Sequence, residues 1–144
     1  MIGEFAARWH AYMRGEFSGG LDELLDEDVI FYSPIVFTPQ RGRDITTLYL
    51  LAAGQNFPGD STPGSSDTGR SSTGGSFRYT KEVMSGDTVV LEFETVIDAK
   101  YVNGVDIITF NAEGRIIEFR VMIRPLQAVN LIHQKMAATL AAME

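Results

Sequence analysis

An aspartate inside an apolar strand pattern is the residue of this sequence best suited to acid–base chemistry. A hairpin of two antiparallel strands is predicted by the segment VDIITFNAEGRIIEFRVMIRP, with its turn at NAEG. Because side chains alternate between the faces of a strand, Asp106 shares one face with Ile108 and Phe110. Phe119 and Val121 are its predicted neighbours on the returning strand. A carboxylate on such a face must find hydrogen-bond donors or keep its proton through a raised pKa, and either outcome makes Asp106 a candidate acid, base or donor.

The register of this hairpin decides whether Asp106 can serve that role. A bulge of one residue would send its side chain to the opposite face of the sheet. There it would pair with Arg120 or Arg124 at the surface and carry no chemistry. The pattern therefore leaves two positions open for Asp106, one in an internal cavity and one in solvent.

The first predicted helix, over residues 3–16, carries aromatic and polar groups that could complete a site. Phe5, Trp9 and Tyr12 follow helical spacing and share one face. They are either core residues or the aromatic wall and hydroxyl donor of a ligand site, with Tyr12 the better candidate for a catalytic role. His10 lies about 100° around the helix from that face, so it is either a surface residue or a candidate base.

The composition excludes several other kinds of site. Only 12 Lys and Arg stand against 19 Asp and Glu, and the net charge of −7 offers no basic stripe for nucleic acid. The absence of cysteine excludes disulfides and thiolate metal sites, and two distant histidines provide too few ligands for a His-rich site. We therefore expect no metal and no cofactor.

The chain shows neither a signal peptide nor a membrane span in its hydropathy. The segment MIGEFAARWHAYMRGEF carries charges throughout, and no apolar run elsewhere reaches about 18 residues. We expect no membrane association, and a cytoplasmic location fits this pattern.

The order of the elements predicts an α+β domain over residues 1–144. Helices are predicted over 3–16, in a short turn at LDELL, over 43–54 and from 126 to the C-terminus. Strand patterns occur in VIFYSP, FRYTKEVMS, TVVLEFETVIDAKYV, VDIITF and RIIEFRVMI. Turn residues occur at 86–87, 103–104 and 111–114, and the long middle run can also break near Asp98. Residues 55–76, rich in Gly, Ser, Thr and Pro, predict a flexible loop that is either an idle insertion or a lid.

The segments WHAYM, LDELLDEDVIFYSPIVFTPQRGRD and GVDIITFNAEGRIIEFRVMIRPL, with the helix order, carry a family resemblance. The chain resembles the nuclear transport factor 2-like superfamily, which includes ketosteroid isomerases, limonene epoxide hydrolases and SnoaL-like polyketide cyclases. The resemblance implies a cystatin-like cone, in which a curved, mainly antiparallel sheet packs on three helices plus a C-terminal helix and encloses an apolar pocket.

The resemblance also implies roles for individual residues. Asp106, five residues before Asn111, looks like the isomerase aspartate that lies in the pocket and donates to the developing oxyanion. Ser33 stands where the isomerases carry their aspartate base, so the resemblance places it at the pocket wall. A serine cannot remove a carbon-bound proton at neutral pH without a base of its own, which argues against steroid isomerisation.

The implied function is binding of a small hydrophobic carbonyl compound by a cofactor-independent cyclase, isomerase or hydrolase. Asp106 would be the acid or base, assisted by Tyr12, with His10 as a further catalytic candidate. The expected ligand-binding wall consists of Trp9, Ser33, Tyr49, Ile108, Phe110, Phe119 and Val121. The alternative is a non-catalytic module that binds a hydrophobic ligand or dimerises.

The outer face of the predicted sheet bears on assembly. It carries Val90, Val96, Ile107 and Met122 beside charged groups, which is more apolar than the exposed sheet of a monomer requires. We therefore expect a homodimer through this face, as the resemblance also implies.

Overall fold

The computed structural model describes residues 1–56 and 77–143 and contains four helices and six strands in those ranges. The helices are α1 (Ile2–Met13), α2 (Leu21–Leu24), α3 (Arg43–Asn56) and α4 (Leu126–Met143). The strands are β1 (Leu25–Tyr32), β2 (Gln40–Arg41), β3 (Arg78–Ser85), β4 (Thr88–Ile97), β5 (Lys100–Phe110) and β6 (Ile116–Arg124). The predicted loop 55–76 begins two residues too early, because α3 extends to Asn56, and its remainder lies outside the described residues.

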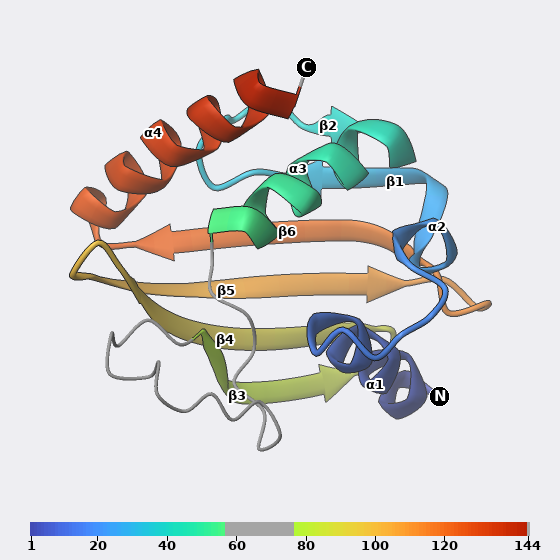
Figure 1. Cartoon of the computed structure of the whole chain (residues 1–144). Helices are drawn as coiled ribbons and strands as arrows, with labels where there is room; N and C mark the ends of the chain where they lie inside the picture. The colour runs from blue at the N-terminus through green and yellow to red at the C-terminus, as the bar shows by residue number, and fades with distance from the viewer. Residues whose placement is uncertain (57–76, 144) are drawn as a thin grey trace.

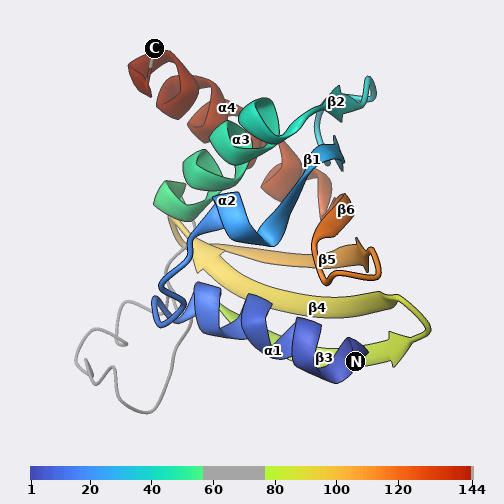
Figure 2. The same cartoon turned by 90° about the vertical axis from the view of Figure 1, so that its right-hand side faces the viewer.

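The six strands form one sheet in the order β2-β1-β6-β5-β4-β3 (Figure 1), in which only β1 and β6 run parallel. Burial alternates strictly along β4, so one face of the sheet is covered and the other is more open. Helix α1 packs on β3 and β4, whereas α3 lies on β1 and α4 on β5 and β6. Figure 2 shows the curved sheet with α1 beside β3 and β4, and with α3 and α4 together near β1 and β6. The two groups of helices therefore cover different parts of the covered face, with the curved sheet spanning them.

The turn between β4 and β5 lies at Asp98 and Ala99, whose φ values are 52° and 65°. The predicted break near Asp98 is thus confirmed, and the predicted turn at 103–104 is wrong, because both residues lie inside β5. Gly104 serves close packing instead: a Cβ there would lie 2.7 Å from the carbonyl oxygen of Met122 and would also meet the ring of Phe93.

The hairpin of β5 and β6 has the register that the alternating pattern predicts. Asp106 pairs with Val121 and Ile108 with Phe119, and the irregularity falls between Thr109 and Phe110, beyond Asp106. The aspartate therefore faces inward and is only 7% exposed. The alternative that Asp106 pairs with an arginine at the surface is wrong: Arg120 pairs with Glu118 at 3.0 Å, and the Arg124 Nε donates to the Asn103 Oδ1 at 2.7 Å.

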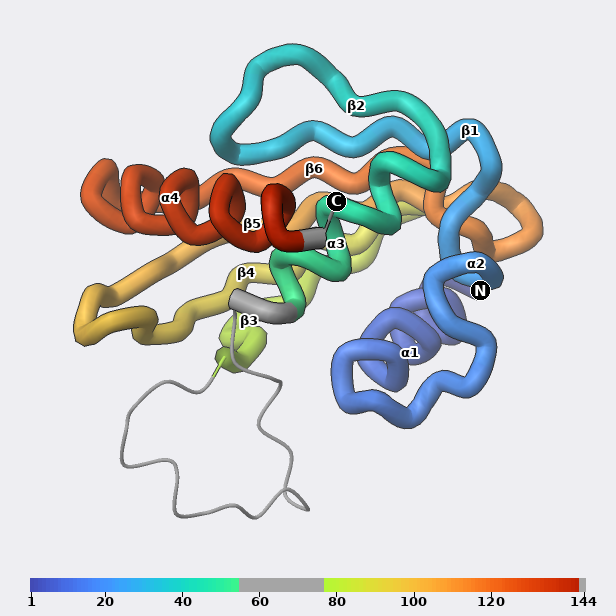
Figure 3. The backbone as a smooth tube through the Cα atoms, turned by 45° about the horizontal axis from the view of Figure 1, so that its top comes forward, coloured from blue at the N-terminus to red at the C-terminus, as the bar shows by residue number. Residues whose placement is uncertain are grey.

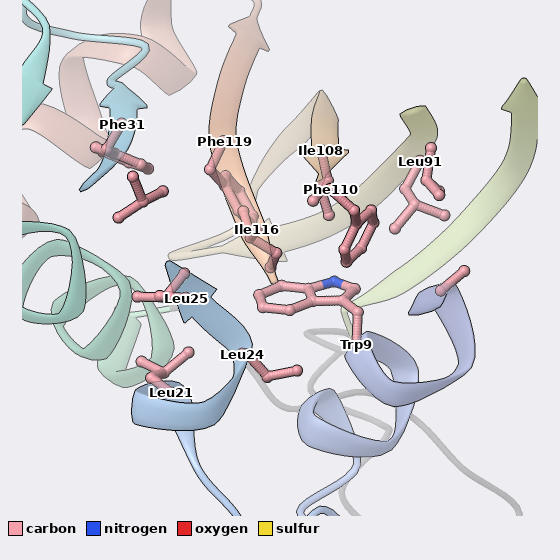
Figure 4. Packing of buried hydrophobic residues seen from close by; sticks show 13 residues of the cluster. Trp9, Leu21, Leu24, Leu25, Phe31, Leu91, Ile108, Phe110, Ile116 and Phe119 are labelled. Atoms are coloured by element: carbon pink, nitrogen blue, oxygen red, sulfur yellow. The ribbon is translucent and has the colours of Figure 1, made fainter. Parts of the chain in front are cut away.

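The largest cluster of buried apolar side chains lies between α1, α2 and the inner face of the sheet. Trp9 packs edge-on against Phe119 with ring centroids 5.1 Å apart, and Figure 4 shows both beside Ile116 and Ile108. A second cluster lies toward α4 and includes Phe77, Phe93 and Ile132. The tube in Figure 3 shows α3 and α4 side by side with α1 apart from them, and the candidate site lies among these three helices.

Candidate functional site

A cavity of about 470 Å³ lies against the inner face of the sheet, lined by residues of α1, α3, α4 and the strands. Its wall is mainly apolar and aromatic, which is typical of small-molecule sites. Its polar side chains, among the described residues, are Tyr12, Ser33, Tyr49, Tyr79, Asp106 and His133, together with the indole of Trp9. The cavity is therefore an apolar pocket with a few separate hydrogen-bonding groups.

Asp106 reaches this cavity from the middle of β5. The Tyr79 hydroxyl donates to the Asp106 Oδ2 at 2.9 Å, and within residues 1–56 and 77–143 this is the one hydrogen bond to the carboxyl group. Burial raises the pKa of Asp106 to about 7, although the hydrogen bond from Tyr79 opposes the shift. Near neutral pH the group is thus divided between its acid and carboxylate forms.

Tyr79 is itself held by Trp9. The Trp9 Nε1 donates to the Tyr79 hydroxyl oxygen at 3.1 Å. An indole N–H can only donate and a carboxylate can only accept, so the Tyr79 proton points to Asp106 when that group is ionised. The chain Trp9, Tyr79, Asp106 therefore joins α1, β3 and β5 with a defined direction of donation.

Tyr79 is the functional residue that the sequence analysis missed. It pairs with Phe93, and Leu91, two residues earlier on β4, pairs with Asp106, so Tyr79 lies on the inner face near the carboxyl group. The alternation of β4 signals which face is inner, but the irregularity after Tyr79 disturbs the register of β3. His133, which is exposed on α4, also lines the cavity.

Four aromatic or apolar residues of the expected wall do line the cavity: Trp9, Tyr49, Phe119 and Val121. Tyr12 lines it as well, with its ring centroid 5.4 Å from that of Trp9, and burial raises its pKa. No hydrogen bond joins Tyr12 to Asp106 in the described structure, so any assistance from Tyr12 would act on the ligand.

Ile108 and Phe110 were expected in the wall, and the structure corrects this expectation. Both are buried in the core, with 0% and 1% of their surfaces exposed, and neither lines the cavity. The reason is that α1 covers this end of β5, where Phe5 lies 5.5 Å from Phe110 between ring centroids. The cavity ends before these two residues.

His10 is likewise not brought into the cavity. Its Nε2 lies 3.3 Å from the Glu82 Oε2, and its ring packs edge-on against the Tyr79 ring with the centroids 5.5 Å apart. Its place on α1, off the face of Trp9 and Tyr12, explains this position. His10 therefore cannot act directly on a ligand in the pocket.

Ser33 lines the cavity just beyond the end of β1. Its Oγ accepts hydrogen bonds from the backbone amides of Ile35 at 2.9 Å and Val36 at 3.2 Å. These bonds hold the turn that follows β1, where Pro34 cannot continue a strand ladder. The predicted place of Ser33 at the wall agrees with this geometry.

Solved structures show what this arrangement resembles. A steroid delta-isomerase from Pseudomonas aeruginosa has a TM-score of 0.81 and 28% identity over 99% of this chain and 93% of its own. An uncharacterised protein with a cystatin-like fold from Silicibacter pomeroyi has a TM-score of 0.72 and 29% identity over 93% of this chain and 83% of its own. An NTF2-like protein from Mesorhizobium loti has a TM-score of 0.64 and 17% identity over 86% of this chain and 91% of its own.

This chain has the nuclear transport factor 2-like fold. The resemblance to that superfamily, the α+β class and the curved, mainly antiparallel sheet are thus confirmed. No protein-family profile and no curated protein sequence matches the chain. In the described part of this nuclear transport factor 2-like chain, no three His, Asp or Glu side chains are placed to hold a metal ion. No described helix is long and apolar enough to cross a membrane.

Proposed function

We propose that this protein binds a small, hydrophobic carbonyl compound and acts on it by acid–base chemistry without a cofactor, with Asp106 at the centre. The observation that carries the proposal is a carboxyl group with a pKa of about 7 in an apolar cavity. A catalytic acid or base works best when its pKa lies near the operating pH. Asp106 meets this condition because of burial, the largest cause of the shift.

The two forms of Asp106 would do different work on a carbonyl compound. As an acid it donates a hydrogen bond or a proton to the carbonyl oxygen, and as a carboxylate it accepts a proton from the neighbouring carbon. Tyr79 stabilises the carboxylate form, and Tyr12 presents a second hydroxyl to the ligand. The similarity to a steroid delta-isomerase supports chemistry of the isomerase or cyclase type. Ser33 supplies no second carboxylate base, which argues against steroid isomerisation by this chain.

The test is turnover of a panel of cyclic enones and diketones by the wild type and by Asp106→Asn. We expect the variant to lose at least about 100-fold in kcat/KM, the usual contribution of a general acid or base. Asp87→Asn is the matched control, because Asp87 is exposed in the turn between β3 and β4 and should keep full activity. Equal turnover by wild type and Asp106→Asn would overturn the proposal.

A second candidate is a non-catalytic module that holds a hydrophobic ligand. The observation in its favour is that Asp106 is the one carboxyl group among the described residues of the lining, so no second carboxyl group accompanies it. In that case ligands bind to the pocket, no compound of the panel is converted, and Asp106→Asn changes affinity alone.

We further propose a homodimer through the outer face of the sheet. Val83, Tyr101 and Met122 project from this face, and each is about half exposed, at 51%, 49% and 51%. Met122→Glu should convert the dimer to a monomer in light scattering. Met84→Glu is the control, because Met84 is 45% exposed but pairs with Val89, whose side chain faces inward. A wild-type monomer would contradict this proposal.

A further inference from the structure

The hydroxyl group of Ser33 is a donor with a free proton. A serine hydroxyl has one proton and two acceptor positions. The amides of Ile35 and Val36 occupy both acceptor positions, and within the described residues no protein group accepts the remaining proton. Because Ser33 also lines the cavity, this proton is available to a ligand.

Ser33 and Asp106 stand in one row across the sheet. Phe31 pairs with Phe119 and Tyr32 with Arg120 in the parallel pair of β1 and β6, so the next residue, Ser33, follows toward Val121.

Val121 in turn pairs with Asp106 on β5. The two side chains therefore lie on the same face and two strand spacings apart, roughly 10 Å between their backbones. A small ring system lying across β6 would reach both groups.

The lining carries little charge. Among the described residues it contains no lysine or arginine, its one imidazole, His133, is exposed on α4, and Asp106 is its one acidic side chain. A ligand anion would find no guanidinium or ammonium partner and would lie in the same apolar cavity as the carboxyl group, which is unfavourable. This charge distribution selects against anions.

We propose that the pocket takes an uncharged ligand with two hydrogen-bond acceptors at opposite ends, one bound by Asp106 and the other by Ser33. Diketones and keto-ethers built on one or two rings have this character. Ser33 is then a specificity residue that binds the acceptor distant from the reacting carbonyl. This inference rests on the proposed binding of carbonyl compounds at Asp106 and adds the second anchor.

The test compares ligands that share one skeleton: 1-decalone, decalin-1,5-dione and decalin-1-carboxylate, each titrated at pH 6 by ligand-observed NMR. A second hydrogen bond should make the dione bind about five- to tenfold more tightly than the ketone, and the carboxylate should bind weakest. If 1-decalone and decalin-1,5-dione bound the wild type with equal affinity, the two-acceptor inference would be overturned but the proposed function would not. No binding of either ketone would instead contradict the proposed function.

Three variants of Ser33 separate donation from support of the turn. Ser33→Thr keeps the hydroxyl and should keep the preference for the dione. Ser33→Ala removes both the hydroxyl donor and the oxygen that accepts from the amides of Ile35 and Val36. Ser33→Asp removes the donor but keeps an oxygen that can accept from these amides. Both should bind the dione no more tightly than wild type binds the ketone. Persistence of the full preference in Ser33→Ala or Ser33→Asp would overturn the assignment.

Discussion

The inner and outer faces of the same sheet treat a carboxyl group in opposite ways. On the inner face Asp106 is buried with one hydroxyl donor, and burial raises its pKa to about 7. On the outer face Glu94 accepts hydrogen bonds from Arg78 and from the Tyr101 hydroxyl, and these bonds lower its pKa. An acid that is exposed beside a cation is held as a structural carboxylate, whereas an acid that is buried without a cation keeps a raised pKa and is suited to proton transfer.

The burial of Asp106 should have its largest effect on the pH dependence of stability. The folded-state pKa of Asp106, about 7, exceeds its ordinary value of 3.8, so the folded state binds this proton more tightly than the unfolded state does. The contribution of Asp106 is therefore fully present below about pH 4 and is lost as the pH rises to about 7. The loss amounts to about 4 kcal/mol of unfolding free energy.

Asp106→Asn measures this contribution, because asparagine resembles the neutral acid. Urea unfolding of the two proteins should give similar stabilities near pH 4 and a more stable variant above pH 7. Glu94→Gln should show the reverse order at neutral pH, since the carboxylate form of Glu94 is the one that the fold stabilises. Parallel pH profiles for wild type and Asp106→Asn would show that the aspartate is not desolvated.

The close packing of the inner face gives the next largest effect. Gly104→Ala should destabilise the fold by about 2 to 3 kcal/mol, because its methyl group would meet the Phe93 ring and the Met122 carbonyl. Gly54→Ala is the matched control in α3, where nothing lies within 4 Å, and it should be neutral or slightly stabilising. Thermal unfolding measures both, and a harmless Gly104→Ala would show that the inner face has spare room.

The hydrogen bond from Tyr79 to Asp106 should have a smaller effect, which appears in the pKa of the carboxyl group. Tyr79→Phe should raise the pKa of Asp106 further, because the carboxylate loses a hydrogen bond that contributes about 1.5 kcal/mol. Trp9→Phe should raise it by a smaller amount, since the indole N–H acts on Asp106 only through Tyr79. Carbon-13 NMR of the Asp106 carboxyl group follows both. An unchanged titration in Tyr79→Phe would contradict the assigned bond.

Substitution on the outer face of the sheet should change the stability least. Arg78→Ala removes the first cause of the lowered pKa of Glu94, so that pKa should rise toward its ordinary value. Because the guanidinium is exposed, we expect the variant to change the stability little. In the wild type, added salt should weaken the ion pair and so raise the pKa of Glu94. Loss of folding in this variant would show that the outer network contributes more than surface ion pairs usually do.

Local pattern was sufficient for the alternation of faces along β4, β5 and β6 and for the helix order. Alternation in β5 placed Asp106 on the face of Ile108 and Phe110, and helical spacing placed Trp9 and Tyr12 on one face, because these periodicities come from the backbone itself. The alternation left open whether a bulge would turn Asp106 to solvent, and the register of β5 against β6 excludes that alternative. The turn at 103–104 was predicted wrongly because glycine occurs both in turns and where another part of the chain packs closely against the backbone. The sequence does not show that Phe93 and the Met122 carbonyl pack against Gly104.

The tertiary structure alone decided where along the strands the pocket lies. Ile108 and Phe110 share the face of Asp106, but α1 covers them and leaves Asp106 in the cavity. It also decided that Tyr79, with His10 behind it, contacts the carboxyl group, since the register of β3 against β4 joins residues distant in sequence. Alternation sets the face on which a side chain lies, whereas register, curvature and helix placement set its neighbours through contacts that no local pattern contains.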